Sequence, residues 1–229
     1  MILTLAPGDF NLNGREVGEQ IAPRKRARVH PAKDWGGTAV DNLLTYGRAE
    51  LILVDNLGRM GSDAHDAMLW CLRAGVHDLF VVSWNVYVGN TPEHVKVGMN
   101  RLHRKDVDVI ALQEVNAGVL SMLHAWAPLN GFWIQAGPVE GGACVVLVAH
   151  RPDRVLLRRN LLKMRVPWVG PKMDIPKKPR VFPVIKVREG DLVIRATSLH
   201  GPTGGINGPN AKAVNEFCRK VRRWVRRAG

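Results

Sequence analysis

Two hydrophobic segments that each end in polar residues decide the fold class: LFVVSWNV at residues 79–86 and VDVIALQE at residues 107–114. Runs of Val, Ile and Leu of this length, bounded by polar residues, are typical of buried strands. Between them, a proline is followed by apolar residues at helical spacing, which predicts a helix over Pro92–Arg104. This stretch therefore predicts both strands and a helix.

Similar short apolar runs along the rest of the chain predict further strands. They lie at Ile2–Leu5, Glu50–Val54, Ala67–Leu72, Phe132–Gln135, Ala143–Ala149, Val181–Val187 and Leu192–Thr197. Helical spacing recurs in Ala117–Trp126 and Ala211–Arg227. Many strands with few helices favour an α/β sandwich. A chain of 229 residues, 46% of them hydrophobic, can bury one sizeable core, so we expect one domain over residues 1–229.

The chain is strongly basic. It has 33 Lys and Arg residues against 20 Asp and Glu, a formal charge of +13. Much of this charge lies in segments expected to be loops, residues 24–28 and 172–180. Such a bias favours polyanionic partners, with nucleic acid first and an anionic membrane surface second. A basic surface that only keeps the protein in solution is the alternative interpretation.

The cysteines and the N-terminal segment bear on where the protein works. Cys71, Cys144 and Cys218 are far apart and form no C-x-x-C pair, which argues against a disulfide framework and a structural zinc site. Residues 1–7 have no basic region before their apolar run, so they predict a strand rather than a signal peptide. No apolar stretch has the length needed to span a bilayer. We expect a cytoplasmic monomer that does not insert into membranes.

Six short polar segments contain the residue types that hydrolysis of a phosphodiester requires. They are G-D-F-N (8–11), V-D-N (40–42), G-S-D-A-H (61–65), S-W-N (83–85), L-Q-E (112–114) and S-L-H-G-P (198–202). Near neutral pH this reaction needs a hard divalent cation on acidic or amide oxygens, a group that activates water, and donors that stabilise the developing charge. The six segments together offer all three.

These segments resemble the motifs of the DNase I-like endonuclease/exonuclease/phosphatase family, which is marked by W-N, L-Q-E, L-H, G-D-x-N and S-D-H. Here G-D-F-N and S-D-A-H come first, but the cyclic order is the same. The chain therefore resembles a circularly permuted member of the family, with one domain over residues 1–229. The resemblance implies a four-layered α/β sandwich, in which two packed, mostly antiparallel sheets are flanked by helices.

The resemblance also implies a metal site. Glu114 resembles the principal metal-binding carboxylate of the family, and Asn85 and Asp63 would complete the site. Carboxylate and amide oxygens suit Mg²⁺ or Mn²⁺. The alternative for Glu114 is a solvated carboxylate at the end of a strand. The S-D-A-H segment departs from the family because Ala64 separates Asp63 from His65, a difference that a bulge could absorb.

Further residues match the family's catalytic positions. Asp9 would orient or activate water and Asn11 would contact the phosphate. These two residues share one face of an extended segment, although an Asx-turn is the alternative. His65 resembles the histidine that contacts the scissile phosphate, Asp41 resembles its carboxylate partner, and His200 resembles the second histidine on the phosphate side. A lone histidine at a strand end is often structural, which is the other interpretation of His200. Three basic residues are expected to contact phosphate or the nucleic-acid backbone: Lys177, Lys178 and Arg180.

Charge and resemblance together predict a metal-dependent nuclease that acts on DNA, or with less support on RNA. A phosphomonoesterase or lipid phosphodiesterase on the same fold is the enzymatic alternative, since the same residues would serve it. A nucleic-acid-binding protein that has lost catalysis is the alternative of another class.

Overall fold

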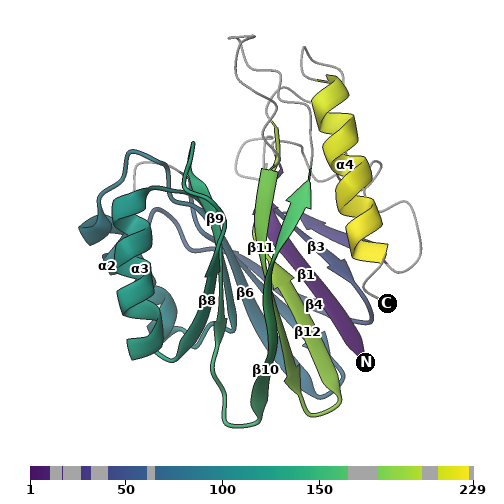
Figure 1. Cartoon of the computed structure of the whole chain (residues 1–229). Coiled ribbons are helices and arrows are strands. Elements are labelled where there is room, and N and C mark those ends of the chain that lie inside the picture. Colours follow the sequence, from purple (N-terminus) through teal and green to yellow (C-terminus); the bar gives the residue numbers. More distant parts are fainter. Residues whose placement is uncertain are drawn as a thin grey trace.

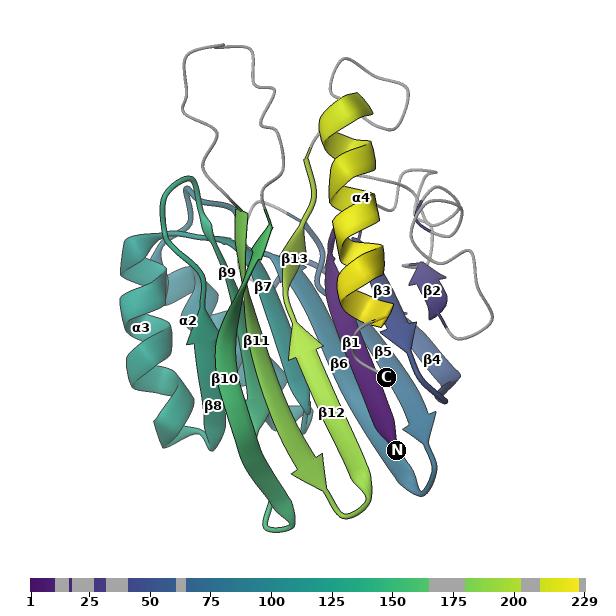
Figure 2. The same ribbon diagram turned by 45° about the vertical axis from the view of Figure 1, so that its right-hand side comes forward.

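Two sheets pack face to face in the molecule (Figures 1 and 2). The computed structural model describes residues 1–10, 17, 27–31, 41–60, 65–164, 180–202 and 211–226. The seven-stranded sheet contains β1 (Ile2–Asp9), β2 (Ala27–Pro31), β3 (Asp41–Tyr46), β10 (Arg154–Met164), β11 (Arg180–Glu189), β12 (Leu192–Thr197) and β13 (Leu199–His200). The six-stranded sheet contains β4 (Glu50–Asn56), β5 (Met68–Ala74), β6 (His77–Asn85), β7 (Val109–Val115), β8 (Phe132–Ala136) and β9 (Ala143–Ala149).

Both sheets are mixed but mostly antiparallel. The first has the order β10-β11-β12-β1-β3-β2, with β13 also paired to β1, and the second has the order β4-β5-β6-β7-β9-β8. In the first sheet β1 runs parallel to β12 and β13, and in the second β6 runs parallel to β7. The other pairs described are antiparallel. Strands β1, β6 and β7, which lead into the polar motifs, therefore lie inside their sheets.

Helices cover the outer faces of both sheets. Helices α2 (Pro92–Arg104) and α3 (Ala117–Leu129) lie on the six-stranded sheet, and α4 (Ala211–Arg226) lies on the seven-stranded sheet (Figures 1 and 2). The order helix, sheet, sheet, helix gives four layers, so the predicted four-layered α/β sandwich is confirmed.

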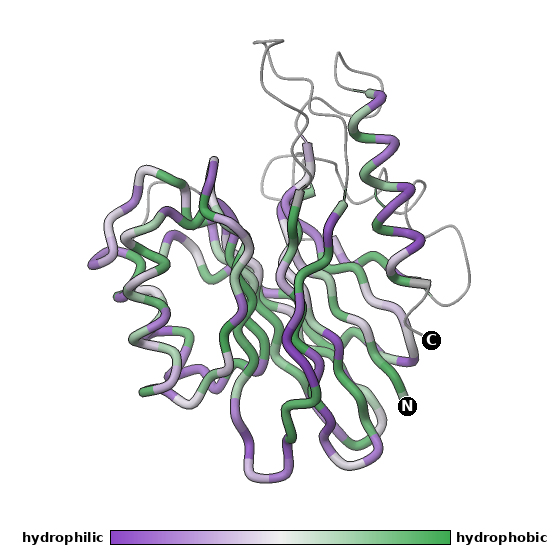
Figure 3. Tube along the Cα trace, viewed as in Figure 1, coloured by the Kyte–Doolittle hydropathy of each residue, from purple (hydrophilic) through white to green (hydrophobic). Residues whose placement is uncertain are grey.

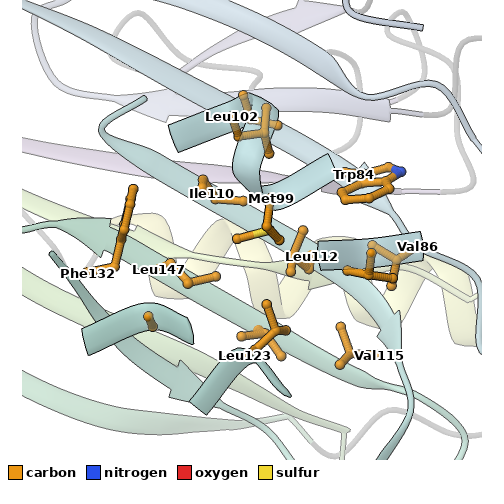
Figure 4. Packing of buried hydrophobic residues seen from close by; sticks show 14 of the residues in the cluster. Trp84, Val86, Met99, Leu102, Ile110, Leu112, Val115, Leu123, Phe132 and Leu147 are labelled. Atoms are coloured by element: carbon orange, nitrogen blue, oxygen red, sulfur yellow. The ribbon is translucent and has the colours of Figure 1, made fainter. Parts of the chain in front are cut away.

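Three hydrophobic clusters fill the three spaces between these layers. Under α2 and α3, Trp84 of β6 packs with Met99 and Leu123 of the helices (Figure 4). Between the sheets, Trp70 of β5 is fully buried among residues of both sheets. Under α4, Phe217 is fully buried in the third cluster. Each fully buried large apolar side chain contributes about 1.5–3 kcal/mol to the stability of the fold. These clusters therefore hold the strand ends in fixed positions relative to one another. Figure 3 shows hydrophobic residues along the central strands and alternating hydrophilic and hydrophobic residues along α4.

The predicted strands and helices all occur, with bounds shifted by a few residues. Strands β2, β3, β10 and β13 were not predicted. The expectation of a loop was wrong for the end of the basic segment, because Ala27 and Arg28 begin β2, a strand at the edge of its sheet. An edge strand has one unpaired side and much solvent exposure, so it lacks the continuous apolar run of a central strand.

The three cysteines are buried and free, as predicted. No helix in the part of the chain that the structure describes is long and apolar enough to cross a membrane. The cytoplasmic location and the monomeric state stay predictions.

Candidate active site

The ends of five strands meet at one rim of the sandwich. Asp9, at the end of β1, pairs in register with Asp41 of β3 on one side and with His200 of β13 on the other. Asn85 ends β6, and Glu114 lies near the end of β7 in the facing sheet. The Nδ2 amide of Asn85 donates to Oδ2 of Asp9 at 3.1 Å and to Oε1 of Glu114 at 3.2 Å. One amide therefore joins carboxylates that belong to different sheets.

Asp9 lies at the centre of this group. Its side chain is only 2% exposed. Nδ1 of His65 is 3.8 Å from Oδ2 of Asp9, and Nε2 of His200 is 4.0 Å from the same oxygen. Nε2 of His200 is also 3.6 Å from Oε1 of Glu114. Both predicted histidines thus face the carboxylates of the rim.

His65 and Asp41 form the pair that the motifs predicted. Nδ1 of His65 is 3.5 Å from Oδ2 of Asp41. The hydrogen bond with Asp41 raises the pKa of His65, and the negative charges of Asp41, Asp9 and Glu114 act in the same direction, against the effect of burial. Burial raises the pKa of Asp41, and the neighbouring charge of Asp9 adds to this, while the hydrogen bond with His65 opposes it. The imidazole therefore keeps its proton to a higher pH than a free histidine does.

A bulge in β7 directs the Glu114 side chain. The register between β7 and β9 shifts between Leu112 and Val115, and Glu114 has a φ of 57°. Bulges often re-aim a side chain beside an active site, and a non-glycine residue at positive φ is held there by its surroundings. Gly142, with a φ of +93°, lies against this turn, where a Cβ atom would come within 2.8 Å of the Glu114 Cα.

A buried polar layer lies beneath the rim and links the sheets. The Nε2 amide of Gln113 donates to Oγ of Ser198 at 3.0 Å, and that hydroxyl donates to the Leu112 carbonyl at 2.8 Å. Oγ of Ser83 lies 3.4 Å from both Oδ1 of Asp41 and Oε1 of Gln113. Ser83, Gln113 and Ser198 are fully buried. The sequence motifs contain these three residues, but their residue types alone signal no role in the site. A buried network of this kind fixes the orientation of the groups bonded to it.

Some predicted site residues cannot be placed in this geometry. Asn11, Asp63, Lys177 and Lys178 lie outside the described residues, as does the side chain of Arg180. For Asn85, Oδ1 accepts the Tyr87 N–H at 3.1 Å, so its nitrogen rather than its oxygen faces the carboxylates. The role of Asn85 as a metal ligand stays a prediction, because it would require the amide to turn.

The donor set at the rim is one of hard oxygens. Among the described residues, no group of three or more His, Cys, Asp or Glu side chains is arranged to enclose a metal ion. Mg²⁺ commonly binds through one or two carboxylates together with waters and substrate phosphates, rather than in a closed protein cage. Glu114 and Asp9, held by the same amide, could supply these carboxylates. The residues present therefore fit Mg²⁺ or Mn²⁺ better than a structural zinc ion.

Comparison with known proteins finds similarity in structure alone. No family model matches the sequence, and no curated protein does. One similar structure is TDP2 of D. rerio complexed with a single-strand DNA product, with 14% identity, 66% of this chain and 56% of that chain covered, and a TM-score of 0.48. A second is the endonuclease domain of TRAS1, a telomere-specific non-LTR retrotransposon, with 10% identity, coverage of 79% and 96%, and a TM-score of 0.44. A third is the human Nocturnin catalytic domain with bound sulfate, with 14% identity, coverage of 64% and 58%, and a TM-score of 0.42.

These likenesses concern the fold, and the sheet topology of this chain is that of the four-layered α/β sandwich that the motifs predicted. The chain spans about half the length of the D. rerio TDP2 structures that it matches, 48% and 56% of them. Likenesses this distant do not carry over an activity or a substrate, since one fold serves many functions. The function is therefore argued from the rim.

Proposed function

We propose that this chain is a divalent-metal-dependent phosphodiesterase that hydrolyses DNA, with RNA as the less favoured substrate. The observation that carries the proposal is the meeting of Asp9, Asn85 and Glu114 with two histidines at one rim, joined across the sheets by the Asn85 amide. Two carboxylates with adjacent imidazoles combine sites for a hard cation with donors for a phosphate.

Glu114 and Asp9 are the carboxylates that would hold Mg²⁺ or Mn²⁺, with Asp63 as a further predicted ligand. When bound, such an ion polarises a phosphoryl oxygen and lowers the pKa of water. Asp9 is buried beside Asn85, which fixes the direction of its carboxylate toward the rim. Asp9 would thus orient the attacking water.

The histidines would act on the phosphate. Asp41 holds Nδ1 of His65, which leaves Nε2 of the half-exposed ring to face a substrate oxygen. His200 is 22% exposed and lies against Glu114, so it can reach the same substrate as the carboxylates. A positively charged or hydrogen-bonding imidazole on each side would stabilise the charge that develops on the phosphate oxygens. Asn11 and Arg180 are proposed as further contacts to that phosphate.

Circular permutation of a single domain over residues 1–229 is part of the proposal. The motif order supports it, because G-D-F-N and S-D-A-H precede S-W-N while the cyclic order is kept. Strand β5, which follows S-D-A-H, is joined to β6, which leads to S-W-N, by a tight hairpin with Gly75 at a φ of +68°. Permutation requires a short junction of this kind between the ordinary ends of a fold.

The proposed substrate rests on charge. The chain has a formal charge of +13, and exposed basic side chains such as Lys212 and Arg223 lie along α4. Contacts of Lys and Arg with phosphates supply most of the sequence-independent affinity for nucleic acid. A polyanion would therefore bind to this protein more readily than a neutral substrate would.

The test is conversion of supercoiled plasmid to nicked and linear forms with Mg²⁺ or Mn²⁺, and with a chelator. We expect metal-dependent nicking that Glu114→Gln abolishes. Asp106→Asn is the matched control, because Asp106 is an exposed carboxylate paired with Arg151 at the other end of β7.

Intact plasmid at high protein concentration would overturn the endonuclease proposal. Phosphate release from nucleotides or phosphoinositides would then identify the phosphomonoesterase or lipid phosphodiesterase. Binding of plasmid without turnover in any metal would identify the nucleic-acid-binding protein that has lost catalysis.

A further inference from the structure

An exposed aromatic side chain stands next to the candidate active site. Tyr87 follows Asn85 by two residues and is 50% exposed, and its neighbour Val88 is 44% exposed. Among the Phe, Tyr and Trp side chains of the described residues, Tyr87 alone is exposed. A ring that is half exposed beside the rim has apolar area left to bury against a bound partner.

The backbone holds Tyr87 in a fixed and strained conformation. Its φ is 62°, a region that non-glycine residues enter at a cost of about 1–2 kcal/mol. The Tyr87 N–H donates to Oδ1 of Asn85 at 3.1 Å, and its carbonyl accepts from the Asn90 N–H at 3.0 Å. The Nδ2 amide of Asn116 donates to the carbonyls of Val88 and Asn90 at 2.8 Å each. The loop that carries the ring is therefore tied down on both sides.

The ring itself lies against the backbone of its own loop. A Cβ atom added at Gly89 would come within 2.6 Å of Cε1 of Tyr87, so the ring lies against this glycine. Half of the side chain nevertheless meets solvent. An aromatic ring that a fixed loop holds in place and leaves half exposed can serve as a stacking platform for a base.

We propose that Tyr87 stacks on a nucleobase next to the scissile phosphate, so that the preferred substrate is nucleic acid with unstacked bases, single-stranded or splayed open. This rests on the proposed function, because Asn85 links the Tyr87 backbone directly to the carboxylates that would face the phosphate. Bases in an intact duplex stack on one another and leave no face free, whereas those of a single strand do. Stacking on an aromatic ring is worth about 1–3 kcal/mol per base and tolerates any sequence.

The test measures binding without turnover. Fluorescence anisotropy would follow a labelled single-stranded DNA oligonucleotide with protein that carries Glu114→Gln, compared with the same protein plus Tyr87→Asn, Tyr87→Phe or Leu129→Ala. Asparagine tolerates positive φ and so removes the ring while the backbone is kept. Leu129, 85% exposed at the end of α3, is the matched exposed apolar control.

We expect Tyr87→Asn to weaken binding of the single strand about tenfold, and Tyr87→Phe and Leu129→Ala to leave it unchanged. With an oligonucleotide of abasic residues, which keeps the phosphates but has no bases, the effect of Tyr87→Asn should vanish. An equal loss with abasic DNA, an equal loss for Tyr87→Phe, or no affinity for single strands would overturn the proposal. Because cleavage does not enter this assay, failure of the nuclease proposal would appear separately, as absence of cleavage both in the plasmid test and with single-stranded circular DNA.

Discussion

Buried carboxylates occur at both ends of the sandwich, and the two ends give them different partners. Asp108 and Glu114 lie near opposite ends of β7. Oδ1 of Asp108 is 3.0 Å from Nη2 of the buried Arg154, and Oε2 of Glu189 is 2.6 Å from the same nitrogen. Arg151 adds a contact of 3.2 Å to Asp108. At this end, each buried carboxylate meets a guanidinium group.

At the rim, the partners described for Asp9, Asp41 and Glu114 are an amide, two imidazoles and a hydroxyl. Three carboxylates are thus gathered close together, in a chain with a formal charge of +13. An ion pair compensates the cost of burying a carboxylate, whereas a cluster of like charges raises that cost. The arginine-paired end therefore contributes to stability, whereas the proposed function assigns the rim carboxylates to a cation.

The sharpest test of this difference is Asp9→Asn. The proposed role of Asp9 predicts a fall in the cleavage rate of about 10³-fold, or about 4 kcal/mol. The free energy of unfolding should stay the same or rise, because a like charge beside Asp41 is removed. Denaturant unfolding and plasmid nicking of the same preparation would measure both. A large loss of stability would show that Asp9 stabilises the fold, and would contradict the proposed difference between the rim and the arginine-paired end.

At the arginine-paired end, the opposite result is expected: a loss of stability without a loss of cleavage rate. Arg154→Met leaves Asp108 and Glu189 without their buried guanidinium, so the free energy of unfolding should fall by about 3 kcal/mol. The cleavage rate per folded molecule should not change. The double variant Arg154→Met, Glu189→Gln should recover part of the loss, because one of the two stranded charges is gone. A selective loss of rate in Arg154→Met would contradict the division of roles.

Two histidines, His65 and His30, lie in opposite electrostatic environments, and His30 makes the free energy of unfolding depend on pH. The carboxylates beside His65 raise its pKa, whereas burial and the neighbouring Arg28 lower the pKa of His30 to about 4. Since His30 ionises near pH 6.5 when unfolded, the unfolded chain takes up the proton first as the pH falls. The free energy of unfolding should thus decrease between about pH 6.5 and 4, by about 2 kcal/mol at pH 5 relative to neutral pH. His30→Gln should lose that much less than the unmodified chain over the same interval. An equal loss in both proteins, taken from the free energies that urea titrations at pH 7 and 5 give, would refute the assignment.

The central strands could be predicted from the sequence, and the edge strands could not. Strands β7 and β9 are buried on both faces and appear as continuous apolar runs. Strand β10 lies at an edge, and residues 157–161 within it are all exposed, so its sequence RVLLRRNLLKM has neither a continuous run nor a clean alternation. The short strand β3 was noticed only for its V-D-N motif. Pairing with β1 and β2 is what makes it a strand.

The residues of the candidate site likewise divide into those that could be predicted from the sequence and those that could not. Asp9, Asn85 and Glu114 could be named because they belong to motifs that resemble those of the DNase I-like family, and each follows or ends a predictable strand. The proposed role of Tyr87 could not, because no motif signals its positive φ or its exposure. The bulge at Glu114 depends on the register between β7 and β9, which is set by pairing of distant segments. Gly142, which makes room for that bulge, belongs to another loop altogether.

Gly142→Ala tests whether the space beside Gly142 is needed to position Glu114 at the rim. Alanine at a φ of +93° is strained, and its Cβ would meet the Glu114 Cα at 2.8 Å, so the carboxylate should move. Gly141→Ala is a matched control, because Gly141 also has a positive φ, of +74°, but its Cβ would meet nothing within 4 Å. Both variants should lose about 1 kcal/mol of stability from backbone strain.

The difference between the two variants should appear in catalysis. We expect Gly142→Ala to cleave about tenfold more slowly, because a small misplacement of a catalytic group is costly, and to need a higher Mg²⁺ concentration for half-maximal rate. Gly141→Ala should keep the rate and the metal dependence of the unmodified chain. If both variants lose rate equally, strain in the loop is responsible and the contact with Glu114 is not. If the metal dependence alone shifts in Gly142→Ala, the carboxylate acts through the cation, which is the function that separates this end of β7 from the arginine-paired one.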